Sequence, residues 1–152
     1  MARRQWIHPG PPTADPTFRK VRADHATETA EDYVEAVSDI VHRHGECRVK
    51  HLVEHMGVSH VTVSRIISRL RDERYVETEH HRPIRLTEKG ERLAAKSRRR
   101  HEIVLQFLLA LGVPEAEADS DAEGIEHHVG SSTLDRMEHF LQRRPAAVKD
   151  QS

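Results

Sequence analysis

Two apolar stripes, separated by a glycine, lie in residues 48–76, which read RVKHLVEHMGVSHVTVSRIISRLRDERYV. On both sides of Gly57 the apolar residues recur with the spacing of one face of an α-helix. Glycine is common just after a helix and serine just before one, so we expect a helix to end at Gly57 and another to begin after Ser59. Two helices joined by such a short turn form a helix-turn-helix.

The flanking segments extend this motif into a larger unit. Residues 29–45, TAEDYVEAVSDIVHRHG, show helical apolar spacing, with Thr29 and Asp32 placed like a capping box and Gly45 at the expected end. Residues 75–90, YVETEHHRPIRLTEKG, predict short strands near 75–79 and 84–87 around a His-His-Arg-Pro turn. Helix, helix, helix and hairpin in this order predict a winged helix-turn-helix domain over residues 29–88.

The rest of the chain predicts helices only. Thr87 is expected to cap a long helix that ends at Gly112, and shorter helices are expected after Pro114 and in residues 131–144. The fold class is therefore mainly α, with a winged helix-turn-helix followed by an all-helical domain over residues 89–144.

The helical domain has more apolar residues than a small core needs. The surplus lies in the run IVLQFLLALGV at 103–113 and in the stripe Leu134, Met137 and Phe140. We therefore expect this domain to form a homodimer.

Both ends of the chain lack an apolar period. Residues 1–28 hold prolines at positions 9, 11, 12 and 16, which predicts a disordered N-terminal arm. Residues 145–152 are expected to form a flexible tail.

The composition limits the class of protein. The chain has 152 residues, of which 32% are charged and 4% aromatic, so the core must be largely aliphatic. No apolar run approaches the roughly 18 residues of a transmembrane helix, and the N-terminus lacks the apolar segment of a secretion signal. Cys47 is the only cysteine, which excludes an intramolecular disulfide and suits a reducing compartment. We therefore expect a cytoplasmic protein that does not bind membranes.

The charge is distributed unevenly along the chain. Residues 59–100 hold 12 Lys and Arg against 6 Asp and Glu, a net +6, whereas residues 112–140 hold 1 against 8, a net −7. A basic middle suggests a polyanionic partner and an acidic end suggests cations, although two solvated faces would give the same pattern.

The predicted helix-turn-helix indicates binding to double-stranded DNA. In this motif the N-terminal residues of the second helix enter the major groove, and residues farther along, or on the wing, contact phosphates. The candidate DNA-binding residues are Ser59, His60, Thr62, Ser64, Arg65, Arg69 and Arg82. The alternative for this polar face is simple solvation.

Residue types that can ligate metals occur in two groups, one toward the C-terminus and one in the first predicted helix. Glu123, Glu126 and His127 are spaced i, i+3 and i+4, so they share one face of a helix. Asp32 and Glu35 make a second carboxylate pair in the first helix. Taken alone, each group is equally typical of a solvated helix face, so the spacing leaves both interpretations open.

Other histidines are poorer candidates for ligands. His51 with His55, and His80 with His81, are interpreted as non-ligands. The chain has no His-Glu-x-x-His sequence, since Leu105 stands where the second histidine would follow His101, and this argues against a zinc peptidase.

The motifs EDYVE at 31–35, RHE at 100–102 and EGIEHH at 123–128, after a winged helix, resemble the manganese transport regulators of the DtxR family of metal-dependent repressors. The resemblance covers about residues 29–142. It implies that the metal ligands are Asp32, Glu35, His101, Glu123, Glu126 and His127, all of the expected residue type.

The resemblance also implies which metal is bound. The iron-sensing branch of the family uses methionine and cysteine where this chain has Asp32 and Glu126. Carboxylate and imidazole ligands suit Mn²⁺, whereas sulfur favours softer metals. Family members can hold two ions with bridging carboxylates, so two Mn²⁺ ions per subunit are expected.

The implied function is a Mn²⁺-responsive repressor that binds a palindromic operator as a homodimer and controls manganese transport genes. An iron-type or MarR-like winged-helix regulator of another ligand is the alternative. A metallohydrolase with Glu126 as base is a further alternative, but the sequence offers no spare nucleophile, so we expect no enzymatic activity.

Overall fold

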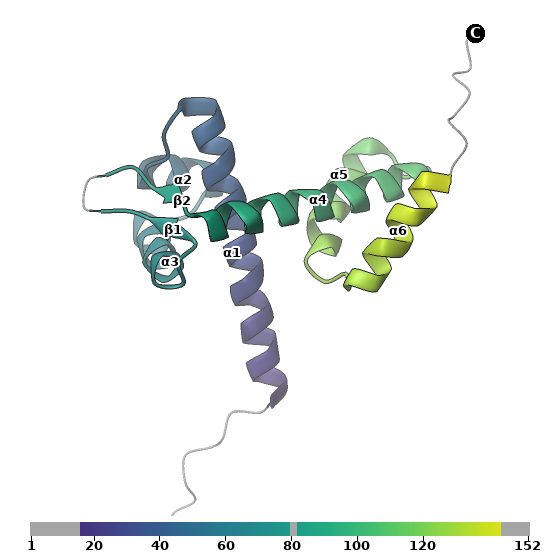
Figure 1. Cartoon of the computed structure of the whole chain (residues 1–152), viewed down its shortest axis with the longest axis horizontal. Helices are drawn as coiled ribbons and strands as arrows, with labels where there is room; N and C mark the ends of the chain where they lie inside the picture. Colours follow the sequence, from purple (N-terminus) through teal and green to yellow (C-terminus); the bar gives the residue numbers. More distant parts are fainter. Residues whose placement is uncertain (1–15, 80–81, 144–152) are drawn as a thin grey trace, which may run out of the picture.

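The computed structural model describes residues 16–79 and 82–143, and it is mostly helical. The elements in order are α1 Pro16–His44, α2 Val49–Met56, α3 His60–Asp72, β1 Val76–Glu77, β2 Arg85–Leu86, α4 Glu88–Ala110, α5 Glu115–Glu126 and α6 Ser131–Arg143. Helices α1 to α3 and the hairpin form one end of the molecule, and α4 leads from it to α5 and α6 (Figure 1). The predicted fold class is confirmed.

The helix-turn-helix forms as its sequence predicts. Gly57 follows α2 in the left-handed region at φ 65°, and its N–H donates to the Val53 carbonyl. The Ser59 side chain accepts a hydrogen bond from the Thr62 N–H at the start of α3. The wing is a short antiparallel pair in which Val76 faces Leu86 and Glu77 faces Arg85.

The first helix begins earlier than expected. Helix α1 starts at Pro16, so the prediction of a start at Thr29, and of a disordered arm through residue 28, is wrong for residues 16–28. Thr29 lies inside the helix and donates its hydroxyl hydrogen to the His25 carbonyl at 2.7 Å instead of capping. Proline is compatible with the first turn, and a helix stabilised by its packed half extends through polar helix formers without an apolar stripe. Residues 1–15 and the predicted tail at 145–152 lie outside the described residues.

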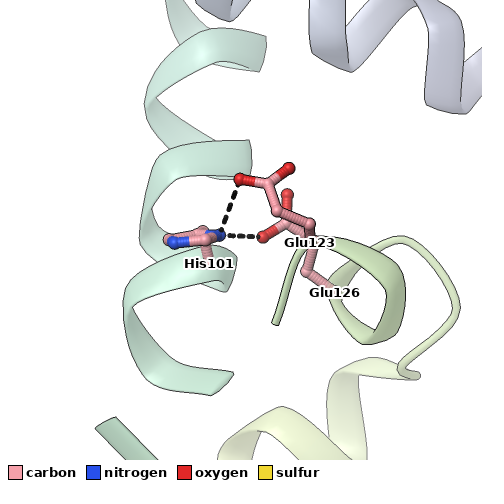
Figure 2. A group of neighbouring side chains, drawn as sticks. All are labelled: His101, Glu123 and Glu126. Atoms are coloured by element: carbon pink, nitrogen blue, oxygen red, sulfur yellow. Dashed lines mark hydrogen bonds and ion pairs between the residues drawn. The ribbon is translucent and has the colours of Figure 1, made fainter. Parts of the chain in front are cut away.

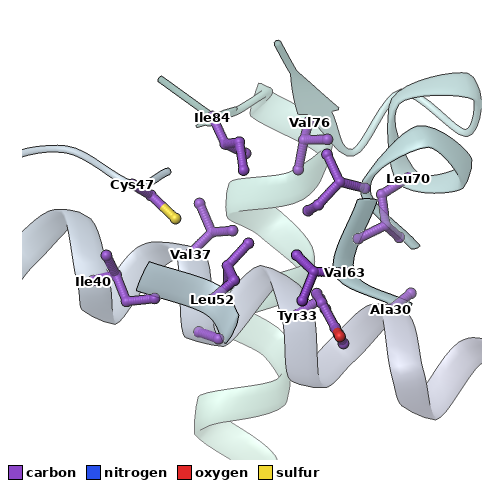
Figure 3. Packing of buried hydrophobic residues seen from close by; sticks show 12 residues of the cluster. Ala30, Tyr33, Val37, Ile40, Cys47, Leu52, Val63, Leu70, Val76 and Ile84 are labelled. Carbon is purple, nitrogen blue, oxygen red and sulfur yellow. The ribbon is translucent and has the colours of Figure 1, made fainter. Parts of the chain in front are cut away.

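The core of the winged helix-turn-helix domain is a cluster to which α1, α2, α3 and the wing all contribute (Figure 3). Its buried members include Ala30, Tyr33, Val37, Ile40, Cys47, Leu52, Val63, Leu70, Val76 and Ile84. The Ile84 N–H donates to the Cys47 carbonyl at 2.7 Å, which ties the wing to the chain before α2.

A second, smaller core joins α4, α5 and α6 through Val104, Ala122 and Leu134. Near it, Leu111 and Phe140 are 58% and 42% exposed, so Phe140 is not a core residue of the single chain. No helix within residues 16–79 and 82–143 is both long and apolar enough to cross a membrane.

The start of α4 is fixed against the wing. The Thr87 side chain accepts a hydrogen bond from the Gly90 N–H, as expected of an N-cap, and the Thr87 N–H donates to the Tyr75 carbonyl at 3.0 Å. Gly90 is buried, and a Cβ there would lie 2.0 Å from the Tyr75 carbonyl oxygen. Only glycine therefore allows this close approach of α4 to the backbone before β1.

Replacing Gly90 with alanine is expected to lower the free energy of unfolding by about 1–3 kcal/mol, because backbone atoms must move apart. Gly124→Ala is the matched control, since a Cβ at this α5 position meets nothing within 4 Å. Urea unfolding of both metal-free variants at equal protein concentration measures the difference. Equal stability of the two variants would contradict the close approach.

Candidate metal centre

A cavity of about 680 Å³ lies between α1 of the DNA-binding domain and helices α4 and α5. Carboxylates on its α1 wall face imidazoles and a carboxylate on the opposite wall. The titratable lining residues are Glu28, Asp32, Glu35, Asp39, His55, Arg98, His101, Glu123 and His127. The cavity thus brings together residues from distant parts of the sequence.

Three of the predicted ligands lie together, and two of them, His101 and Glu123, line this cavity (Figure 2). His101 lies on α4, and Glu123 and Glu126 lie on α5. The His101 Nδ1 is 2.6 Å from a Glu126 oxygen and 3.5 Å from a Glu123 oxygen. One possible ligand atom from each of the three lies within 4.8 Å of the others, which is compatible with a shared metal ion.

A second group forms around His127, which follows the last residue of α5. Its Nε2 lies 3.2 Å from an Asp32 oxygen and 3.6 Å from a Glu126 oxygen. Glu126 therefore belongs to both groups, with Oε2 near His101 and Oε1 near His127. The remaining predicted ligand, Glu35, lines the same cavity from α1.

Burial raises the pKa of three carboxylates of the site. Burial raises the pKa of Glu126 to about 7, against the neighbouring His101 that acts to lower it. Burial also raises the pKa of Asp32 and the pKa of Glu35 above their ordinary values. A bound divalent cation would favour the ionised forms of all three.

Acidic neighbours raise the pKa of His127. Burial acts to lower the pKa of His127, but contacts with Glu31, Asp32 and Glu126 outweigh it and raise the pKa overall. The imidazole and carboxylate donors of this site are those that suit Mn²⁺. None of the six predicted ligands carries sulfur, although Met56 lines the cavity. The residues present therefore fit a divalent ion that prefers oxygen and imidazole ligands, such as Mn²⁺.

The sequence did not identify Glu31 as a functional residue. Glu31 is buried, and its Oε2 lies 2.9 Å from the Nδ1 of His127. Metal-bound histidines commonly donate their second ring N–H to a carboxylate, which fixes the ring and its tautomer. The one signal in the sequence was that a carboxylate directly precedes Asp32, and this could not show which of the two faces His127.

The candidate DNA-binding residues lie at the start of α3, farther along α3 and on the wing. Ser59, His60, Thr62 and Arg65 are exposed at the start of α3, and Ser64 beside them is partly buried, with its hydroxyl 3.3 Å from the His60 Nδ1. Arg69 donates to the Ala26 carbonyl of α1 at 3.3 Å, and its side chain is 37% exposed. Arg82 is exposed on the wing, 3.9 Å from Glu79.

Both parts of the chain match one family. Residues 25–84 match the N-terminal DNA-binding domain of iron-dependent repressors, and residues 87–145 match their metal-binding and dimerisation domain. The chain is 44% identical over 129 residues to the transcriptional regulator MntR of Escherichia coli O157:H7, covering 85% of this chain and 83% of that protein. It is 33% identical over 116 residues to the HTH-type transcriptional regulator MntR of Bacillus subtilis strain 168, covering 76% and 82%.

Solved structures show the same fold. A manganese-dependent transcriptional repressor in complex with manganese is 30% identical, with a TM-score of 0.65 over 74% of this chain and 52% of that one. The manganese regulator SloR is 28% identical, with a TM-score of 0.66 over 76% of this chain and 54% of that one. The chain spans about half the length of these solved relatives.

Because its two parts match the family's two domains in order, and the match extends through most of the length of the MntR regulators, the chain belongs to the DtxR family of iron-dependent repressors.

Proposed function

We propose that this protein is a Mn²⁺-activated transcriptional repressor that binds operator DNA as a homodimer and controls manganese transport genes. The observation that carries the proposal is the cavity between α1 and helices α4 and α5, where carboxylates of the DNA-binding domain face the imidazoles of His101 and His127. The names of its relatives describe transcriptional regulators and a manganese-dependent repressor, not enzymes.

The predicted ligands come from both the DNA-binding domain and the C-terminal helices, so metal binding could affect DNA binding. Asp32 and Glu35 lie on α1, which packs in the core of the DNA-binding domain, while the other ligands lie on or directly after α4 and α5. A cation bound by the α1 ligands and by the ligands of α4 and α5 would restrict the orientation of α3, the helix proposed to enter the major groove, relative to the rest of the dimer. DNA and metal would then strengthen each other's binding by the same factor, typically about 5–150-fold.

Two ions per subunit are part of the proposal. The His101, Glu123 and Glu126 group and the His127, Asp32 and Glu126 group share a single buried carboxylate. The two Glu126 oxygens face different histidines, so Glu126 would contribute a ligand atom to each of the two groups. We assign the ions' ligands to Asp32, Glu35, His101, Glu123, Glu126 and His127.

A dimer would place two α3 helices on a palindromic operator, with half-sites about 34–36 Å apart or a multiple of this spacing. The exposed apolar side chains of Leu111, directly after α4, and Phe140 on α6 support a subunit interface there. We place the DNA-binding domain from α1 to residue 88, the dimerisation and metal-binding domain at 89–144, and the protein in the cytoplasm with its operator.

Titration of Mn²⁺ into chelator-stripped protein is the first test of this function. Fluorescence anisotropy should show that Mn²⁺, and not Mg²⁺, strengthens binding to the DNA upstream of its own gene by about tenfold or more. Glu126→Ala should abolish the stimulation and leave the dimer intact in sedimentation. Glu102→Ala, at an exposed position next to His101, is the control that should respond like wild type. DNA binding that is strong without metal would refute the proposal.

Glu31→Gln is expected to weaken Mn²⁺ binding by about 10–100-fold, because the carboxylate that orients His127 is lost. Glu28→Gln removes the same charge from the wall of the cavity without touching the contact to His127, so its effect should be clearly smaller. Electron paramagnetic resonance of free Mn²⁺ measures both affinities. Equal losses in the two variants would show that net charge matters and the contact does not.

Arg65→Ala and Arg69→Ala test which face of α3 reads DNA. Arg65 is exposed, so its loss should cost about 1–3 kcal/mol of specific binding if it contacts a base. Arg69 is engaged with the Ala26 carbonyl, so Arg69→Ala should mainly lower thermal stability. Anisotropy on operator and scrambled DNA separates these effects. A loss of specificity in Arg69→Ala that matches Arg65→Ala would instead support the DNA contact predicted for Arg69 from the sequence.

A further inference from the structure

Three consecutive arginines precede His101, and each one contacts a different helix. Arg98 donates to Asp39 on α1 at 2.9 Å. Arg99 pairs with Glu138 on α6. Arg100 reaches the end of α5, where it contacts backbone and no side chain in the hydrogen bonds of the described residues. The three adjacent arginines therefore differ in their partners: two contact carboxylates on other helices, and Arg100 contacts backbone carbonyls.

Arg100 makes a forked contact with two backbone carbonyls. Its Nε donates to the Glu126 carbonyl at 3.0 Å, and a terminal nitrogen donates to the same oxygen and to the Val129 carbonyl at 2.8 Å. Carbonyls at the end of a helix have no partner within the helix. A guanidinium at this end also interacts favourably with the helix dipole. The planar fork of arginine suits both acceptors, which a lysine ammonium would contact only as a point charge.

The two carbonyls bracket the segment that carries two candidate ligands. Glu126 is the last residue of α5, His127 follows it, and the second anchored carbonyl belongs to Val129. Next to Arg100 on α4, the His101 ring holds the Glu126 side chain at 2.6 Å (Figure 2). Helix α4 thus holds the backbone of Glu126 with one residue and its carboxylate with the next.

From this geometry we infer that Arg100 is a positioning residue of the metal centre. It fixes the backbone of residues 126–129, so that the side chains of Glu126 and His127 are already placed before an ion binds. Without it, the ion would have to order this segment at an entropic cost, and its affinity would fall. This inference rests on the proposed function, because it assigns a role within the proposed metal site.

The competing explanation is that Arg100 only caps α5 and so stabilises the fold. Arg99 offers a matched comparison, because it is the adjacent arginine and also joins α4 to another helix, but through a side-chain pair on the surface. Loss of Arg99 should therefore cost an interhelix contact and leave residues 126–129 in place.

The experiment compares full-length, metal-stripped Arg100→Gln, Arg100→Lys and Arg99→Gln with wild type. Mn²⁺ affinity is measured by electron paramagnetic resonance of the free ion, metal-free stability by thermal unfolding, and coordination geometry by the visible absorption spectrum of bound Co²⁺. We expect Arg100→Gln to bind Mn²⁺ about 10–100-fold more weakly, Arg100→Lys to be intermediate, and Arg99→Gln to stay close to wild type. The Co²⁺ spectrum should change in the Arg100 variants, which a merely stabilising cap would not cause.

Unchanged Mn²⁺ affinity and an unchanged Co²⁺ spectrum in the Arg100 variants would overturn the inference, as would an equal loss in Arg99→Gln. If Arg100→Gln does not fold, the comparison of Arg100→Lys with Arg99→Gln decides by the same criteria. Failure of the proposed function would appear in the wild type itself, as an absence of Mn²⁺ binding, and it would overturn both proposals. Failure of this inference alone would appear only in the difference between variants.

Discussion

The arrangement of the candidate metal centre depends on one buried carboxylate. This is the side chain of Glu126, at the end of α5, which lies between His101 of α4 and His127. The Glu126 side chain is 2% exposed, and its oxygens face His101 at 2.6 Å and His127 at 3.6 Å. Burying an ionised carboxylate is costly unless positive charge or hydrogen-bond donors compensate for it. The raised pKa of Glu126, about 7, expresses this constraint, and a cation between α1 and α5 would relieve it.

Helix α4 contacts both the candidate metal centre and the DNA-binding domain. At its start, Thr87 and Gly90 hold it against the backbone of Tyr75, just before the wing. Farther along, Arg98 contacts Asp39 on α1 and His101 faces the metal ligands of α5. The same helix therefore contacts the wing, α1 and the candidate metal centre, so in the proposed function it would connect an ion in the cavity to the position of the domain that carries α3.

Local signals in the sequence predicted much of the fold. Ser59 and Thr87 cap their helices, and Gly57 takes the left-handed conformation, because capping and positive φ depend on neighbouring residues only. The start of α1 was mispredicted because a polar helix, continued from a packed one, has no apolar period to reveal it. The six candidate ligands came from a family resemblance, and spacing alone left them ambiguous with solvated helix faces.

The sequence by itself determined the winged helix-turn-helix, the helical C-terminal domain and the residue types available for a metal ion, because these follow from periodicity and short-range chemistry. Only the tertiary structure decided that the Glu31 carboxylate lies 2.9 Å from the ring of His127, which is 96 positions away in the chain. It also decided that Arg100, and not Arg98 or Arg99, contacts the Glu126 carbonyl. A contact to a backbone carbonyl leaves no trace in residue identity, since every residue has one, so the partner of each arginine is set by the packing of α4 against α1, α5 and α6.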